Sequence, residues 1–203
     1  MASRAKKSKV NRLASITTGI GIGLLILAGS ILYRLLHDPL RHELTYAVHT
    51  LKSTETALIP PNTDFALTID KIGAVSAIVQ DVDPLNSRIY QAALTKGIAH
   101  AKGTTVPGQG GNIFLFAHSS ADLLTAERYN SVFYLMHHLE AGDVIKVWYQ
   151  GVEHDYVVTE QKLVAPSDIQ YLTKKTSEEQ LTLMTCWPPG TSFKRLIVIA
   201  KPL

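Results

Sequence analysis

The sequence predicts an all-β domain with short helices, built as a closed barrel or sandwich of seven or eight strands and preceded by one N-terminal transmembrane helix. Short apolar, β-branched segments recur from residue 65 to the C-terminus with turn residues between them, which is typical of all-β architectures. The long apolar run at residues 13–33 contains no charged side chain. We detect no internal repeat and no low-complexity segment.

The first 33 residues divide into a basic tail and an apolar helix. The tail, residues 1–12, carries five bases and no acid, namely Arg4, Lys6, Lys7, Lys9 and Arg12. An uncharged apolar stretch of about 18 residues or more can span a bilayer as a helix, and residues 13–33 are long enough. Because basic flanks stay cytoplasmic, we expect a single-pass protein of the cell membrane with residues 34–203 outside. The alternative is a cleaved signal peptide, for which Ala28-Gly29-Ser30 offers a weak site.

Residues 34–62 are expected to form a stalk or an accessory helix. The spacing of polar and apolar side chains in residues 43–51 is compatible with a short helix, and Pro60-Pro61 ends the segment. The segment serves as a spacer, packs as a helix, or covers the functional site as a lid; we favour the first two. The catalytic domain then occupies residues 63–203.

From residue 65 onward, predicted strands alternate with short connections. Apolar and β-branched runs predict strands at residues 65–69, 72–79, 113–117, 144–149, 154–160, 181–185 and 195–200. Helices or helical turns are expected at residues 84–94, within 126–139 and at 166–172. Residues 97–111 are rich in turn formers and are predicted to be a loop. Gln150-Gly151 predicts a hairpin turn.

Charge and cysteine content narrow the possible functions. Five of the 20 bases lie in the tail, which leaves residues 13–203 with 15 bases against 17 acids, a formal charge of −2. This part also lacks a basic stripe with interleaved aromatic residues, so we exclude nucleic-acid binding. The single cysteine, Cys186, cannot form an intramolecular disulfide. An unpaired thiol outside the cytoplasm is explained by catalysis or by burial as a small apolar residue.

Three residues at the ends of predicted strands indicate thiol chemistry. Cys186 comes just before Trp187-Pro188-Pro189-Gly190, which cannot continue a strand, Arg195 opens the next strand, and His118 follows the strand at 113–117. The thiolate is the nucleophilic form, and a free cysteine with a pKa of about 8.5 is mostly protonated at neutral pH. His118 would take the proton or pair with the thiolate as imidazolium, and would later protonate a leaving amine. Arg195 stays charged and would stabilise an oxyanion or hold the substrate backbone.

The sequence Thr182-Leu183-Met184-Thr185-Cys186, followed by Arg195 at the start of an apolar strand, resembles the signature of the sortase family. Three more stretches agree with the family in order: Ile72-Gly73 before an apolar strand, the run Gly97-Ile98-Ala99-His100-Ala101-Lys102-Gly103-Thr104, and Pro107-Gly108-Gln109-Gly110-Gly111-Asn112 before the His118 strand. Ala117 departs from the glycine that many members have before the histidine, but alanine is nearly as small. The resemblance covers residues 64–203 and implies a closed sortase-type β-barrel.

The resemblance implies a membrane-anchored cysteine transpeptidase of the general surface-protein or pilin type. Cys186 would attack the threonine carbonyl of a sorting motif similar to Leu-Pro-x-Thr-Gly (LPXTG) on a secreted protein and form a thioacyl-enzyme. An amine from a cell-wall precursor or a pilin lysine would then resolve it. The implied partners are these two substrates and the lipid bilayer, and no cofactor is needed. Asp38-Pro39 also resembles the lid motif of pilin-type members.

Four further residues are candidates for substrate binding: Thr185, Trp187, His100 and Ala117. Trp187 opens a loop that should border the substrate groove. The alternative for Thr185 is a simple strand former. The alternative for His100 is packing in its loop, or a hydrogen bond to the backbone.

We expect no metal site. His137 and His138 are adjacent, so they lack the i, i+4 spacing of a helical metal pair, and contacts with solvent and core explain them better than zinc. Calcium is the one exception that remains open: Asp81 and Asp83 lie close together, although two acids are a weak signal against the usual solvated loop.

Two other functions remain open. A membrane-tethered cysteine peptidase would use the same residues with water as the acceptor. A non-catalytic surface scaffold would use the barrel only to present a groove. A second class of wall transpeptidase places its cysteine in a Ser-His-Gly-Cys context, which residues 183–188 do not match.

Overall fold

The computed structural model describes residues 18–33, 37, 40–41, 43–44, 46–48, 57–119 and 131–203. The chain divides into two compact units, Met1–Arg41 and His42–Leu203. The basic tail at 1–12, the first part of the predicted transmembrane helix at 13–17, and much of the predicted stalk lie outside the described residues.

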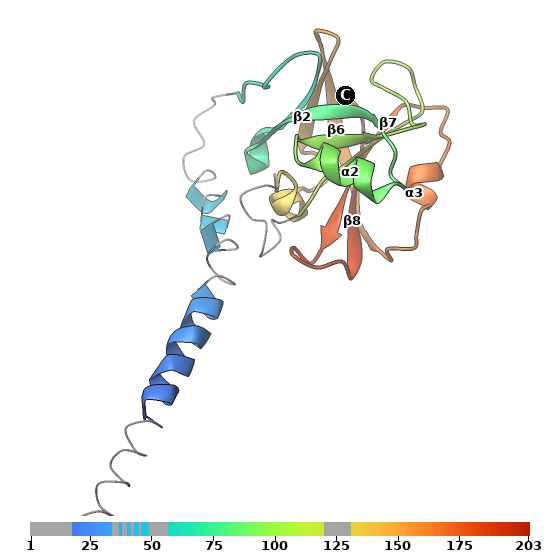
Figure 1. Ribbon diagram of the computed structural model, residues 1–203. Coiled ribbons are helices and arrows are strands. Elements are labelled where there is room, and N and C mark those ends of the chain that lie inside the picture. Colours follow the sequence, from blue (N-terminus) through green and yellow to red (C-terminus); the bar gives the residue numbers. More distant parts are fainter. Residues whose placement is uncertain are drawn as a thin grey trace, which may run out of the picture. The chain divides into compact units, whose positions relative to one another are not determined.

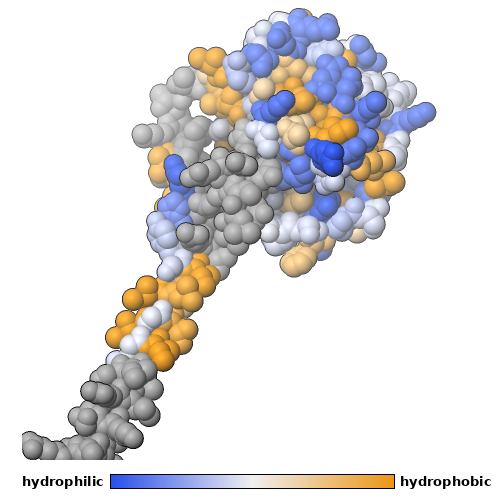
Figure 2. Space-filling model, viewed as in Figure 1, coloured by the Kyte–Doolittle hydropathy of each residue, from blue (hydrophilic) through white to orange (hydrophobic). Residues whose placement is uncertain are grey.

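In the first unit, residues 18–33 form a helix with mostly exposed side chains. Apolar residues cover this helix, including Leu24, Leu25 and Ile26, which are 60%, 73% and 66% exposed (Figure 2). Within the described residues, no helix combines the length and the apolarity that crossing a membrane requires.

The second unit contains a closed β-barrel of eight strands (Figure 1). The strands are β1 (Phe65–Ile69), β2 (Ala74–Val82), β3 (Ile98–Ala101), β4 (Asn112–Phe116), β5 (Val144–Tyr149), β6 (Val152–Val164), β7 (Gln180–Trp187) and β8 (Lys194–Pro202). Their order around the barrel is β1-β2-β3-β4-β7-β8-β6-β5, and the pairing of β1 with β5 closes it. The closed barrel is therefore confirmed over the sandwich. The barrel is mixed, because β2–β3 and β4–β7 are parallel and the other pairs are antiparallel.

The helical segments between the strands are short. In the second unit they include η1 (Asp70–Ile72), α2 (Ser87–Leu94), η2 (Tyr134–His138) and α3 (Gln170–Thr173). The predicted helix at 84–94 begins only at residue 87, because the Asn86 side chain accepts the backbone N–H of Ile89 as an N-cap. The predicted strand at 72–79 begins later, at residue 74, because η1 ends at Gly73 with φ +63°, a left-handed conformation that suits glycine.

The predicted loop at 97–111 contains a strand, β3, that the sequence did not indicate. β3 is only four residues long and is buried throughout between β2 and β4. Gly97 allows this strand to approach β2, because a Cβ on Gly97 would lie 2.3 Å from the carbonyl oxygen of Ala77. The run that resembles the family motif therefore forms a strand of the barrel and its entry turn.

The loop before β4 is fixed to the barrel by one carboxylate. Glu179 accepts the backbone N–H groups of Gly108 and Gly110 at 2.9 and 3.0 Å, and the hydroxyl of Tyr156 at 2.7 Å. Burial and the hydrogen bond to Glu179 raise the pKa of Tyr156, so this hydroxyl stays protonated as a donor. The anchored loop enters β4, which is buried at all five positions as a central strand.

Candidate active site

Three neighbouring strands, β4, β7 and β8, determine where the predicted catalytic residues lie. In the parallel pair β4–β7, Phe116 is aligned with Met184. In the antiparallel pair β7–β8, Cys186 is aligned with Arg195. The end of β4, the end of β7 and the start of β8 therefore meet at one end of the barrel.

Two hydrogen bonds extend the alignment of β4 and β7 beyond Phe116. The N–H of Ala117 donates to the carbonyl of Met184 at 3.2 Å, and the Thr185 hydroxyl donates to the carbonyl of Ala117 at 2.9 Å. His118 directly follows Ala117 in the chain, and Cys186 directly follows Thr185. These bonds therefore set His118 level with Cys186.

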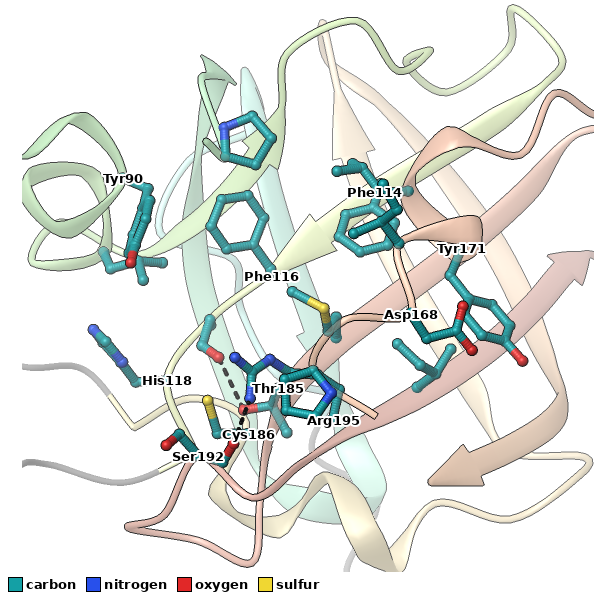
Figure 3. Close-up of a pocket in the computed structure, with 18 of the residues that line it drawn as sticks. Tyr90, Phe114, Phe116, His118, Asp168, Tyr171, Thr185, Cys186, Ser192 and Arg195 are labelled. Carbon is teal, nitrogen blue, oxygen red and sulfur yellow. Dashed lines mark hydrogen bonds between the residues drawn. The ribbon is translucent and has the colours of Figure 1, made fainter. Parts of the chain in front are cut away.

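His118, Cys186 and Arg195 all line one pocket of about 450 Å³. Figure 3 shows the three side chains at the same end of this pocket. The thiol of Cys186 is half-buried, and it is open to a ligand from the pocket. The structure thus brings together the three residues that the sequence placed at strand ends.

Burial lowers the pKa of His118 below its ordinary value, because desolvation penalises the imidazolium. The neutral imidazole is favoured at neutral pH, and it is the form that can accept a proton from a thiol. His118 therefore suits the role of general base towards Cys186.

Arg195 is held over the loop at 187–194. Its Nη1 donates to the carbonyl oxygens of Ser192 and Lys194 at 3.3 and 3.1 Å. A guanidinium carries five N–H donors, so these two bonds leave it able to bind an oxygen in the pocket. Arg195 lies in the same pocket as the thiol and can stabilise negative charge on a carbonyl that the thiol attacks.

Beyond these three residues the pocket is mainly apolar. Its walls come from α2, β4 and the segment that contains α3, and include Tyr90, Leu94, Phe116, Ile169, Tyr171 and Leu172. A groove of this size with apolar walls and polar groups at one end fits a short peptide with aliphatic side chains. The sequence predicted a helix at 84–94, but it gave no sign that this helix or α3 would line the pocket.

Of the predicted substrate-binding residues, Ala117 and Thr185 line the pocket. The Thr185 hydroxyl is engaged with the Ala117 carbonyl, so in this structure it positions the two strand ends (Figure 3). Trp187 follows Cys186 but is not part of the described lining of the pocket. The ring of Trp187 packs against that of His137, with centroids 5.1 Å apart.

His100 does not belong to the described lining of the pocket either. It is fully buried in β3, where Nδ1 accepts the N–H of Asp81 at 3.3 Å and Nε2 donates to the carbonyl of Thr105 at 2.9 Å. The hydroxyl of Thr104 lies 3.0 Å from the same Nε2. This placement favours the alternative of packing and backbone hydrogen bonds over substrate binding.

Two sets of possible metal ligands differ in their surroundings. Asp83 accepts the N–H of Leu85, and Asp81 lies 3.9 Å from His100, so these acids take part in separate local interactions. Within the described part of the chain, one group gathers three possible ligands: Glu43, His137 and His138. The sequence pattern did not predict this group.

The barrel domain is similar to known proteins. The sortase domain family matches residues 67–203. Sortase D of Bacillus subtilis (strain 168) is 30% identical over 138 residues, which cover 66% of this chain and 61% of that protein.

Solved structures have the same fold. The lid mutant of sortase A from Corynebacterium diphtheriae superposes with a TM-score of 0.58 at 25% identity, covering 70% of each chain. Sortase C-1 from Actinomyces oris gives a TM-score of 0.57 at 26% identity, covering 70% of this chain and 74% of that one.

Proposed function

This chain belongs to the sortase family, and we propose that it is a membrane-anchored cysteine transpeptidase. Its substrates would be secreted proteins with an LPXTG-like sorting motif, and its acceptor an amine of a cell-wall precursor or a pilin lysine. The observation that carries the proposal is the convergence of Cys186, His118 and Arg195 at one end of an apolar pocket.

The first half of the reaction forms a thioester. His118 takes the proton of Cys186, and the sulfur attacks the carbonyl carbon of the motif's threonine. Arg195 stabilises the oxyanion of the tetrahedral intermediate. When the intermediate collapses, the C–N bond breaks, and His118 gives its proton to the departing amine of the next residue.

The second half transfers the acyl group. The acceptor amine attacks the thioester carbon and loses a proton to His118, while Arg195 again stabilises the oxyanion. The C–S bond breaks, the new amide leaves, and Cys186 regains its proton. No group beyond these three side chains is required for either half.

The apolar pocket supports recognition of the motif's leucine and proline. The aromatic and aliphatic walls from α2, β4 and the α3 segment would bury these side chains, and the threonine carbonyl would then lie near Cys186. The basic tail at 1–12 and the uncharged run at 13–33 support attachment to the outer face of the cell membrane.

The test is intact mass spectrometry of the full chain, kept in mild detergent, after incubation with a library of LPXTG-like peptides. An acyl adduct that is absent in Cys186→Ala, and that an added amine converts to ligated peptide, is the expected result. If only water resolves the adduct, the protein is a cysteine peptidase and the proposal is wrong. No adduct with any peptide, from a chain whose thiol reacts normally with iodoacetamide, would point to a scaffold.

A further inference from the structure

A cluster of three side chains lies outside the pocket and has no role in the proposed reaction. Glu43, His137 and His138 each present one ligand atom, and these atoms lie within 4.8 Å of one another. We infer that the cluster is a binding site for a divalent transition-metal ion of the zinc type. Two imidazoles and one carboxylate are a known zinc ligand set, with further positions left to water.

The two distances from the histidines to the carboxylate are close to those between ligands of a tetrahedral ion. Nε2 of His137 lies 3.5 Å from Oε1 of Glu43, and Nε2 of His138 lies 3.1 Å from Oε2. Metal–ligand bonds of about 2.1 Å place two ligands of a tetrahedral zinc ion about 3.4 Å apart. The two imidazole nitrogens and the carboxylate thus need only small movements to share one ion.

The ring of His137 is already oriented for a metal. Its Nδ1 donates to the carbonyl of Tyr134 at 3.1 Å, which fixes the tautomer with the lone pair on Nε2, the atom that faces Glu43. This backbone hydrogen bond from the second nitrogen is the usual support of a metal-ligating histidine.

The ring of His138 is also held in place. It stacks on Tyr46, with centroids 4.1 Å apart and an angle of 12° between the planes. Tyr46 and Glu43 are close together in the sequence, whereas both histidines lie at the end of η2. His138 is 95 residues away from Glu43 in the sequence. A bound ion would therefore cross-link the segment that contains Glu43 to the barrel.

Exposure of the cluster allows an ion to enter. The side chains of His137 and His138 are 24% and 26% exposed, and that of Glu43 is 42% exposed. The side chains are thus partly exposed while the rings are held by neighbours. Water can complete the coordination sphere.

The cluster also touches the neighbour of the nucleophile. The His137 ring packs 5.1 Å from that of Trp187, which directly follows Cys186 on β7. Because Trp187 is one of only two tryptophans, its fluorescence can report an ion at His137. This readout does not depend on transpeptidation.

The experiment is isothermal titration of the untagged, metal-free full chain with Zn²⁺, in mild detergent and in the Cys186→Ala background so that the thiol cannot bind the ion. We expect one ion per chain. Glu43→Gln and His138→Gln should each weaken binding at least about tenfold, since each removes a ligand. His154→Gln, which changes a half-buried histidine on β6 outside the cluster, is the matched control and should bind like the parent.

A second measurement uses the parent sequence at the cluster and does not depend on how its variants fold. Co²⁺ added to the Cys186→Ala, Trp148→Phe chain, which lacks the thiol beside Trp187, should quench the remaining fluorescence of Trp187, and Zn²⁺ should prevent the quenching by competition. If Zn²⁺ does not bind, the cluster is an ion pair only. If the parent binds Zn²⁺ no more tightly than Glu43→Gln and His138→Gln, the ion binds elsewhere. Either result overturns the inference, and neither bears on the transpeptidase.

Discussion

β3 and β4 are neighbouring antiparallel strands; β3 contains one histidine and β4 is followed by another, and the two histidines have different surroundings. His100 lies within β3, is fully buried, and has both ring nitrogens in hydrogen bonds to the chain around it. His118 lies two residues beyond the end of β4 and lines the pocket next to Cys186. Position along the strand therefore separates a histidine that holds the barrel from one that can take part in a reaction.

Burial affects both histidines, but the two neutral rings that it favours have different roles. Burial lowers the pKa of His100 and of His118, so both favour the neutral ring. In His100 the neutral ring serves as acceptor and donor for backbone groups. In His118 the neutral ring faces the pocket that holds a thiol, where it can act as a base.

The largest expected effect comes from His118→Ala. The rate at which Cys186 forms the thioacyl-enzyme should fall by about 10²–10⁴-fold, because proton transfer by a positioned side chain contributes this much. Single-turnover mass spectrometry with a cleavable peptide measures the rate. The urea midpoint should change little; an unchanged acylation rate in a folded variant would remove His118 from the mechanism.

Arg195→Gln should have the next largest effect. Loss of one charged donor to the oxyanion lowers the acylation rate by about 10²–10³-fold. The matched control is Lys201→Gln, an exposed cation near the other end of β8, which should react at the parent rate. Equal rates for the two variants would show that Arg195 acts only on the loop at 187–194.

His100→Ala tests whether His100 stabilises the barrel without taking part in the reaction. The variant should lose stability by about 1–3 kcal/mol, because the N–H of Asp81 and the carbonyl of Thr105 would be left without their buried partner. Urea unfolding followed by circular dichroism measures the loss. Acylation per folded molecule should stay within about twofold of the parent; a large loss of rate with parent-like stability would return His100 to the substrate site.

The smallest effect is a dependence of stability on pH. The unfolded chain protonates His100 and His118 near the ordinary pKa of 6.5, whereas the folded chain protonates these two side chains only at lower pH. At pH values between the lowered pKa of the folded chain and the ordinary pKa of the unfolded chain, the unfolded state holds more protons. The free energy of unfolding should therefore fall as the pH drops below about 6.5. Urea midpoints at pH 7.5 and 5.5 measure this decrease, which should be smaller in His100→Ala; the same decrease in both proteins would locate it in other groups.

Much of the barrel and the three central site residues could be predicted from sequence. β4 and β8 contain the unbroken apolar runs 113–116 and 196–200, and β7 is rich in apolar residues and threonine, so the pattern alone indicates strands. The turn residues after Cys186 marked the end of β7 and placed the thiol at a strand end. Arg195 and His118 followed from the same reasoning about where strands begin and end.

The rest depends on contacts that local sequence does not reveal. β3 is a short run of Ile, Ala and His with little strand preference of its own, and its pairing with β2 and β4 makes it a strand. Glu43 and His138 are 95 residues apart, so no motif spacing could connect them. The boundary at Gly73 was missed because a single left-handed residue ends η1 before β2 starts.

β7 is paired along both edges, with β4 on one side and β8 on the other. Its backbone amides should therefore exchange with deuterated solvent only when the whole barrel unfolds, while those of the loop between β7 and β8, residues 188–193, should exchange much faster. The nucleophile thus lies at the boundary between the slowest and the fastest exchanging parts of this region. A peptide that binds beside Cys186 should slow exchange in the loop and leave the strand unchanged, which gives a map of substrate engagement without any chemical label.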